Sequence, residues 1–202
     1  MPSTVVFDVG NVLIRWDPRL LFRKIFDDAA AMDSFLTEVT PPAWNVEQDR
    51  GRSWADAVAE TVARHPEHEV AIRAWDTRWQ EMVPGPIAGS VAILDALHRR
   101  AVPLYAITNF SAEKWAETRE RFPFLKERFR DTVVSAHERL LKPDPAIYRC
   151  LLERNGLAAA DCIFIDDSPK NVEGARAVGM EAVQFTGPEA LAEALRGYGL
   201  PV

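Results

Sequence analysis

Cysteine and histidine are scarce in this sequence of 202 residues. The two cysteines are Cys150 and Cys162. Cys162 falls in an apolar run, which predicts a buried free thiol, and so small a number excludes a disulfide framework. Among the four histidines, only His65 and His68 are close enough in sequence to share a metal ion. They lie beside Pro66 in a polar stretch, which is typical of a solvated helix end, so we predict no histidine metal site.

Long apolar runs and an excess of basic residues are also missing. No run approaches the roughly 18 apolar residues that a membrane-spanning helix needs, and no basic-then-apolar leader precedes the first strand-like stretch. Asp and Glu number 30 against 24 Lys and Arg, a formal charge of -6. That balance argues against nucleic acid or an anionic membrane as the main partner. We therefore expect a cytoplasmic protein that binds neither.

An apolar strand followed by a carboxylate opens the chain. Residues 5–7 are Val-Val-Phe, Asp8 follows, and Gly10-Asn11 turns the chain before a second apolar run. Such a run, bounded by turn residues, is typical of a fully buried strand in a parallel sheet. Because open α/β sheets hold ligands at the carboxyl ends of their strands, Asp8 stands where a reactive carboxylate would be placed.

From residue 87 onward, strands alternate with helices. The expected strands are 104–107, 132–134, 162–165 and 182–185. Ser111 and Ser168 stand where they could cap the helices that follow the first and third of them. This alternation predicts an α/β fold with a Rossmann-like, doubly wound parallel sheet.

Residues 15–84 never alternate as a strand does. Asp17-Pro18 predicts a helix from Arg19 to about Ala31, and two further amphipathic helices are expected after Ser53 and over 69–82. We interpret 15–84 as a small helical-bundle cap inserted after the first strand, with 1–14 and 85–202 as the α/β core. The alternative is that these helices belong to one continuous core.

Polar side chains end three of the predicted strands: Asp8, then Thr108-Asn109, then Asp166-Asp167. Lys142 lies on the loop after the expected strand 132–134. Parallel strands place their carboxyl ends on one edge, so these groups can converge. Three carboxylates repel one another unless a cation neutralises them, and Mg²⁺ prefers such oxygen ligands. A carboxylate nucleophile, a divalent metal and a lysine indicate phosphoryl transfer through an aspartyl-phosphate on Asp8.

With these motifs the chain resembles the haloacid dehalogenase superfamily, which consists mostly of phosphatases with a Rossmann-like core and a helical cap. The resemblance implies that Asp8 is the nucleophile, that Thr108 and Asn109 bind phosphate, and that Lys142 is the lysine of the third motif. The stretch Phe-Asp-Val-Gly-Asn-Val-Leu is similar to a bacterial subgroup that contains sugar-phosphate phosphatases such as glucose-1-phosphate phosphatase.

The resemblance also implies a metal site. Asp167 matches the usual metal-binding carboxylate of the fourth motif, Asp166 stands beside it, and Asn171 follows one turn on. Asp8 and the backbone carbonyl of Gly10 would complete the Mg²⁺ ligands.

Gly10 departs from the family pattern. Family phosphatases usually carry a second Asp two residues after the nucleophile, which acts as general acid and base, and that role is typically worth 10²–10⁴-fold in rate. We therefore expect a slower enzyme, a substrate with a good leaving group, or an acid borrowed from the cap. Glu47, Asp49 and Arg50 on a probable cap loop are candidates for substrate contact.

The sequence thus predicts a Mg²⁺-dependent phosphatase, a monomer or homodimer, that acts on a small phosphorylated metabolite such as a sugar phosphate. Two alternatives remain open. One is a metal-independent 2-haloacid dehalogenase, in which Asp8 displaces halide from carbon. The other is a degenerate member, disabled at Gly10, that binds a phosphorylated ligand or a protein without turnover.

Overall fold

The computed structural model of the chain describes residues 1–202. Its centre is a sheet of five parallel strands in the spatial order β3-β2-β1-β4-β5. The strands are β1 (Thr4–Phe7), β2 (Leu104–Thr108), β3 (Asp131–Val134), β4 (Cys162–Asp166) and β5 (Glu181–Gln184). The predicted doubly wound parallel sheet is confirmed, with β1 in the middle of it.

The three central strands are apolar because both of their faces are covered. Every residue of β1, β2 and β4 is buried, whereas the edge strands β3 and β5 each keep some residues partly exposed. Burial on both faces explains why these segments appear in the sequence as continuous apolar runs and do not alternate with polar residues.

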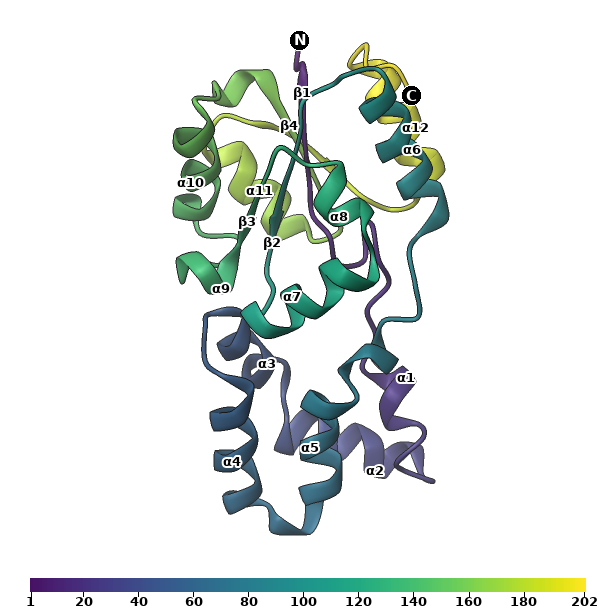
Figure 1. Cartoon of the computed structure of the whole chain (residues 1–202), viewed down its shortest axis with the longest axis vertical. Coiled ribbons are helices and arrows are strands. Elements are labelled where there is room, and N and C mark those ends of the chain that lie inside the picture. Colours follow the sequence, from purple (N-terminus) through teal and green to yellow (C-terminus); the bar gives the residue numbers. More distant parts are fainter.

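Helices cover the two faces of the sheet (Figure 1). On one face α10 and α11 pack over a buried cluster that includes Val6 and Phe164, and on the other α6 and α12 pack over the side that includes Phe7. The helices of this part are α6 (Ala88–Arg99), α7 (Ala112–Arg121), α8 (Phe124–Glu127), α9 (Ser135–Glu138), α10 (Pro145–Asn155), α11 (Pro169–Ala177) and α12 (Pro188–Gly197), with the 3₁₀ turn η4 (Ala159–Asp161). None of the helices in the chain has the length and apolar character needed to cross a lipid bilayer.

Residues 15–84, called the helical segment below, contain no strand. They lie beyond the carboxyl ends of the strands, at the bottom of Figure 1. The elements are α1 (Arg19–Phe22), α2 (Ala29–Ser34), the π-helical turn η1 (Phe35–Val39), α3 (Pro42–Asp49), α4 (Trp54–Arg64), the 3₁₀ turn η2 (Pro66–His68), α5 (Glu69–Thr77) and the 3₁₀ turn η3 (Trp79–Met82). The division of the chain into core and cap stays a prediction.

The single helix predicted from Arg19 to Ala31 is wrong. The chain forms two short helices there, because the carboxylate of Asp28 accepts the backbone N–H of Ala31 at 2.9 Å and so begins a new helix at Ala29. An aspartate just before a helix accepts a backbone N–H that would otherwise have no partner at the start of that helix. Asp28 therefore favours a new helix start over continuation of the preceding helix. By contrast, the cap predicted at Ser53 is present: its side chain accepts the N–H of Asp56.

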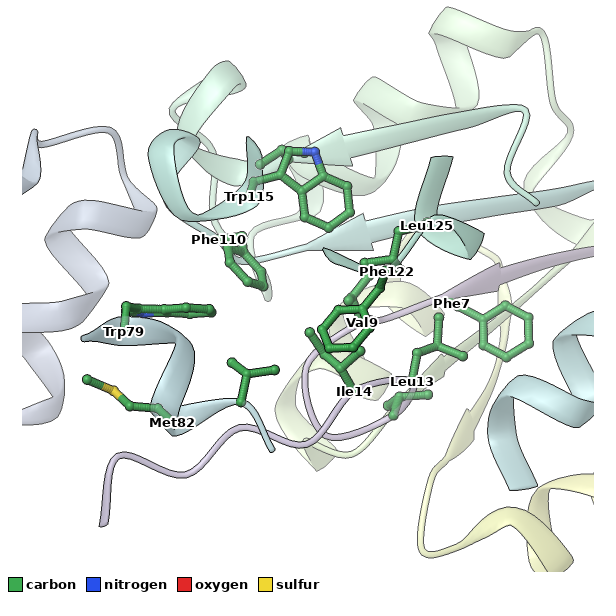
Figure 2. Packing of buried hydrophobic residues seen from close by; sticks show 14 of the residues in the cluster. Phe7, Val9, Leu13, Ile14, Trp79, Met82, Phe110, Trp115, Phe122 and Leu125 are labelled. Carbon is green, nitrogen blue, oxygen red and sulfur yellow. The ribbon is translucent and has the colours of Figure 1, made fainter. Parts of the chain in front are cut away.

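One apolar cluster joins the helical segment to the sheet. Figure 2 shows Phe7 of β1, Phe110 and Trp115 near α7, and Trp79 and Met82 of η3 within it. The ring centroids of Trp79 and Phe110 lie 5.3 Å apart, and those of Phe110 and Trp115 5.6 Å apart. Buried aromatic contacts therefore hold the helical segment against the sheet edge, in addition to the two covalent connections at residues 14–15 and 84–85.

We expect Trp75→Ala to lower the free energy of unfolding by about 3–5 kcal/mol, the usual cost of removing a buried Trp side chain. Trp75 is 2% exposed, and its ring centroid lies 5.5 Å from that of Trp44 and 5.1 Å from that of Phe22. Urea denaturation measures the loss. Val70→Ala is the control on the same helix, because Val70 is 76% exposed. Because the cluster is continuous, a single transition is expected; separate transitions for the two parts would contradict that continuity.

Candidate active site

Strand order and register bring the polar strand ends together. Asp8 directly follows β1, Thr108 ends β2 and Asp166 ends β4, and both β2 and β4 are neighbours of β1. Phe7 pairs with Ile165, so Asp8 stands level with Asp166. From β1 the chain continues to β2 and β3 on one side of the sheet and then returns to β4 and β5 on the other. The strand order therefore reverses beside β1, the usual place for a ligand site.

A buried lysine links the two central carboxylates. The Nζ of Lys142 lies 2.7 Å from Oδ1 of Asp8 and 2.7 Å from Oδ2 of Asp166. The side chains are 1%, 9% and 0% exposed, respectively. At this depth, ion pairs are weakly screened by solvent, so one ammonium offsets much of the repulsion between the two carboxylates.

Asn109 positions this lysine. Its Oδ1 accepts the backbone N–H of Lys142 at 2.9 Å, and its Nδ2 donates to the backbone carbonyl of Lys142 at 3.1 Å. The side-chain amide thus pairs with both backbone groups of one residue. Asn109 joins the predicted site, but its side chain is engaged in holding the loop that carries Lys142.

Thr108 is buried without a hydrogen-bond partner. Its side-chain oxygen, Oγ1, has no partner in the protein, and the residue is 1% exposed. Buried hydroxyls are nearly always satisfied, so an orphaned one at a strand end is available to a ligand oxygen. The phosphate-binding position predicted for Thr108 is consistent with this free hydroxyl.

The carboxylate of Asp166 has a full set of partners. Besides Lys142, it accepts the backbone N–H of Ser168 at 2.9 Å and the amide of Asn171 at 3.0 and 3.1 Å. Ser168, which was expected to cap the next helix, makes no side-chain cap hydrogen bond, and its own backbone N–H is held by Asp166. Asp167, the next residue, is only partly enclosed, and its side chain makes none of these hydrogen bonds.

Asp8, Asp166 and Asp167 form a cluster that suits a cation. Each offers a carboxylate oxygen, and these oxygens all lie within 4.8 Å of one another. Three carboxylates and one lysine leave two negative charges, which a divalent ion with hard oxygen ligands would balance. Because Asp166 already accepts several hydrogen bonds, Asp8 and Asp167 have the freer ligand atoms.

The electrostatics follow from burial. Burial raises the pKa of Asp8 to about 7; Lys142 opposes this shift and Asp166 adds to it. Burial alone would lower the pKa of Lys142, but Asp8 and Asp166 outweigh it and raise that pKa. Burial, with Asp166 beside it, also raises the pKa of Asp167.

A cavity of about 140 Å³ lies between this sheet edge and the helical segment. From the core side it is lined by Gly10, Asn11, Ile14, Asn109, Phe110 and Ser111, and from the helical segment by Trp16, Asn45, Asp49, Trp54 and Trp79. The tryptophans and Asn45 were not predicted as site residues. For Trp54 and Trp79 the signal in the sequence was the concentration of Trp between residues 40 and 80, which does not extend to Trp16 or Asn45.

Of the three polar residues predicted for substrate contact, only one reaches the cavity in the structure. Asp49 lines the cavity. Glu47 and Arg50 do not: they are exposed and lie 3.6 Å apart as an ion pair. The cap predicted at Ser111 is also different, because its Oγ accepts the indole N–H of Trp54 at 2.8 Å and makes no cap hydrogen bond.

Comparison with known sequences gives a family match and relatives that align with most of this chain. The sequence model described as haloacid dehalogenase-like hydrolase matches residues 2–179. A sesquiterpene phosphatase from Aspergillus oryzae is 28% identical, over 91% of this chain and 90% of that protein. A phosphoglycolate phosphatase from Pseudomonas savastanoi pv. phaseolicola is 27% identical, over 92% of this chain and 70% of that protein.

The fold is also similar to solved structures. A haloacid dehalogenase family enzyme from Bacteroides thetaiotaomicron, solved as a magnesium complex, superimposes with a TM-score of 0.75 at 21% identity. The match covers 96% of this chain and 98% of that one. At this identity the likeness establishes a shared architecture, in which the helical segment takes part.

We expect Lys142→Met to lower the free energy of unfolding by about 3–5 kcal/mol at pH 8 in chelator, because it leaves buried carboxylates without their partner. The loss should shrink at pH 5, where Asp8, with its pKa of about 7, takes up a proton. Urea denaturation at both pH values measures this. Lys170→Met, at an exposed position on α11, is the control. A loss equal to that of the control would show that the buried pairs contribute no stability.

Proposed function

Because this chain belongs to the haloacid dehalogenase-like hydrolase family, we propose that it is a Mg²⁺-dependent phosphatase that hydrolyses a small sugar phosphate through an aspartyl-phosphate on Asp8. The observation that carries the proposal is the buried contact of Lys142 with Asp8 and Asp166, beside the unpartnered hydroxyl of Thr108. Asp8 as nucleophile, Lys142 as fixed cation and the free hydroxyl of Thr108 thus lie together at the carboxyl ends of the strands.

In the proposed reaction the carboxylate of Asp8 attacks phosphorus, and the ester oxygen leaves with the electrons of the broken bond. Water then attacks the aspartyl-phosphate, which releases phosphate and restores Asp8. Lys142 holds positive charge at the reacting oxygens, and the hydroxyl of Thr108 is free to hydrogen-bond a phosphate oxygen.

Mg²⁺ would be held by Asp8, Asp167 and the backbone carbonyl of Gly10, with Asp166 beside them. When bound, it supplies positive charge that offsets the phosphate and the clustered carboxylates. The charge of the cluster also favours a phosphatase over a metal-independent dehalogenase. A site that displaces halide without metal would have no use for Asp167 so close to Asp8 and Asp166.

The cavity supports a small substrate. Its volume of about 140 Å³ lies below the ~300 Å³ at which pockets for drug-sized ligands begin, which favours a compact substrate. Trp54 and Trp79 contribute aromatic rings to the lining, and Asn45 contributes a side-chain amide. Aromatic faces beside polar amides suit a sugar ring, which has apolar faces and hydroxyl edges.

We expect Asp8→Asn to lower the rate of phosphate release by about 10³-fold or more, because it removes the nucleophile. A panel of sugar, nucleotide and small-acid phosphates with Mg²⁺ gives the measurement and the substrate class. Asp161→Asn is the matched control, since Asp161 is an exposed aspartate just before β4, at the opposite edge of the sheet. Unchanged release by Asp8→Asn would refute the proposed mechanism.

Removal of metal with a chelator should abolish phosphate release. Added Mg²⁺ should also raise the melting temperature of the protein, and by more at pH 8 than at pH 5. The pKa of Asp8 rises from 3.8 to about 7 on folding. The folded state thus favours the protonated acid, and the cost of ionising it accumulates as pH rises through that interval. A cation stabilises the ionised form, so its benefit is greatest above pH 7. Equal shifts at both pH values would contradict a metal site that includes Asp8.

A further inference from the structure

The position two residues after Asp8 is open space. A methyl group built on Gly10 would meet no atom within 4 Å, and the backbone of Gly10 does not adopt the positive φ that favours glycine. Neither crowding nor conformation therefore demands a glycine here. The leaving oxygen of a phosphate ester still needs a proton, and a group from another part of the chain has room to supply it.

Asp49 is the one acidic or basic side chain among the residues that line the cavity beside Gly10. It is the last residue of α3 and enters the cavity from the helical segment. Every other polar group of the lining belongs to Asn, Ser or Trp, none of which exchanges a proton near neutral pH. By its place in the fold, Asp49 faces the strand ends from the opposite wall.

Asp49 is fixed to the loop that follows β2. The hydroxyl of Ser135 donates to the backbone carbonyl of Asp49 at 2.6 Å and accepts the backbone N–H of Phe110 at 2.9 Å. The carboxylate of Asp49 accepts the side-chain amide of Asn45 at 3.5 Å, and the backbone N–H of Ser111 lowers its pKa. Because Phe110 and Ser111 directly follow Thr108 and Asn109, these contacts place the carboxyl beside the proposed phosphate site.

The acidity of Asp49 suits proton transfer. Burial raises its pKa to about 7, against the opposing influence of the Ser111 N–H and of Lys142. A carboxyl with a pKa near the working pH can be protonated at the start of a reaction and ionised later in the same cycle.

We infer that Asp49 is the general acid and base of this enzyme, in place of the side chain that Gly10 lacks. The assignment rests on the phosphatase activity proposed above. In the first step Asp8 forms a bond to phosphorus, the phosphorus–oxygen ester bond breaks, and the proton of the Asp49 carboxyl passes to the leaving oxygen, which departs as an alcohol.

In the second step the ionised Asp49 takes a proton from water as the water oxygen bonds to phosphorus. The bond from phosphorus to Asp8 breaks and its electron pair returns to the Asp8 carboxylate. Asp49 ends protonated, so both groups are restored and the net reaction is ester plus water giving alcohol plus phosphate.

The test compares leaving groups. With a sugar phosphate, whose alkoxide leaves only with a proton, Asp49→Asn should lower turnover by about 10²–10⁴-fold, the usual contribution of general acid–base catalysis. With p-nitrophenyl phosphate, whose phenolate leaves without a proton, the first step should stay near the wild-type rate. Slow hydrolysis of the aspartyl-phosphate should then produce a burst of p-nitrophenol stoichiometric with enzyme, followed by slow release.

Three companion variants make the result decisive. Asp49→Ala should share the burst, whereas Asp49→Glu, which keeps a carboxyl, should restore part of the turnover. Asp27→Asn, at an exposed aspartate of the helical segment that makes no hydrogen bond or ion pair, should behave as wild type. If Asp49→Asn lost activity equally with both substrates and showed no burst, the role of Asp49 would be overturned. Phosphate release by the unmutated protein would still support the proposed phosphatase activity in that case. A wild-type protein that hydrolyses no phosphate ester would instead overturn the proposed function.

Discussion

The site depends on a buried ammonium placed between two carboxylates. The Nζ of Lys142 contacts Asp8 and Asp166 at 2.7 Å each, in a region where the three side chains are almost fully enclosed. Without that charge, two parallel strands could not end in adjacent buried carboxylates, because each ionised group would repel the other with little screening. The lysine in turn depends on Asn109, whose amide binds both backbone groups of Lys142. Asn109, just after β2, thus positions the lysine that offsets the repulsion between the carboxylates at the ends of β1 and β4.

The same arrangement explains why the site needs both parts of the chain. The sheet edge supplies the proposed nucleophile, the lysine and the clustered carboxylates, while the helical segment encloses the space above them. Hydrogen bonds connect the parts beside the cavity, among them those from the Trp54 indole to Ser111 and from Ser135 to the backbone of Asp49. Closing the cavity removes water, which strengthens the electrostatic interactions inside it and raises the pKa of any carboxyl at its wall. The enclosure of the cavity is therefore also what adjusts the acidity of the carboxyl groups at its wall.

Much of the fold and the strand-end cluster could be predicted because local rules govern them. Central strands buried on both faces must be apolar, so β1, β2 and β4 were visible as uninterrupted runs. Parallel strands share an edge, so Asp8, Thr108 and Asp166 were expected to converge before any contact was known. The helix from Asp17 failed for the opposite reason: a turn and a second cap at Asp28 divided it, and apolar spacing alone does not reveal where a helical pattern is interrupted.

The sequence by itself determined the sheet, the order of its strand-end groups and the absence of a side chain at Gly10. Only the tertiary structure decided which groups of the helical segment reach the cavity. Glu47 and Asp49 lie two residues apart on one helix, yet one is exposed and the other lines the cavity. Their difference arises from how α3 packs against the loop after β2, through contacts such as that of Ser135 with Asp49. Periodicity and capping describe neighbours in sequence, whereas the environment of a carboxyl is set by residues that only the folded chain brings near.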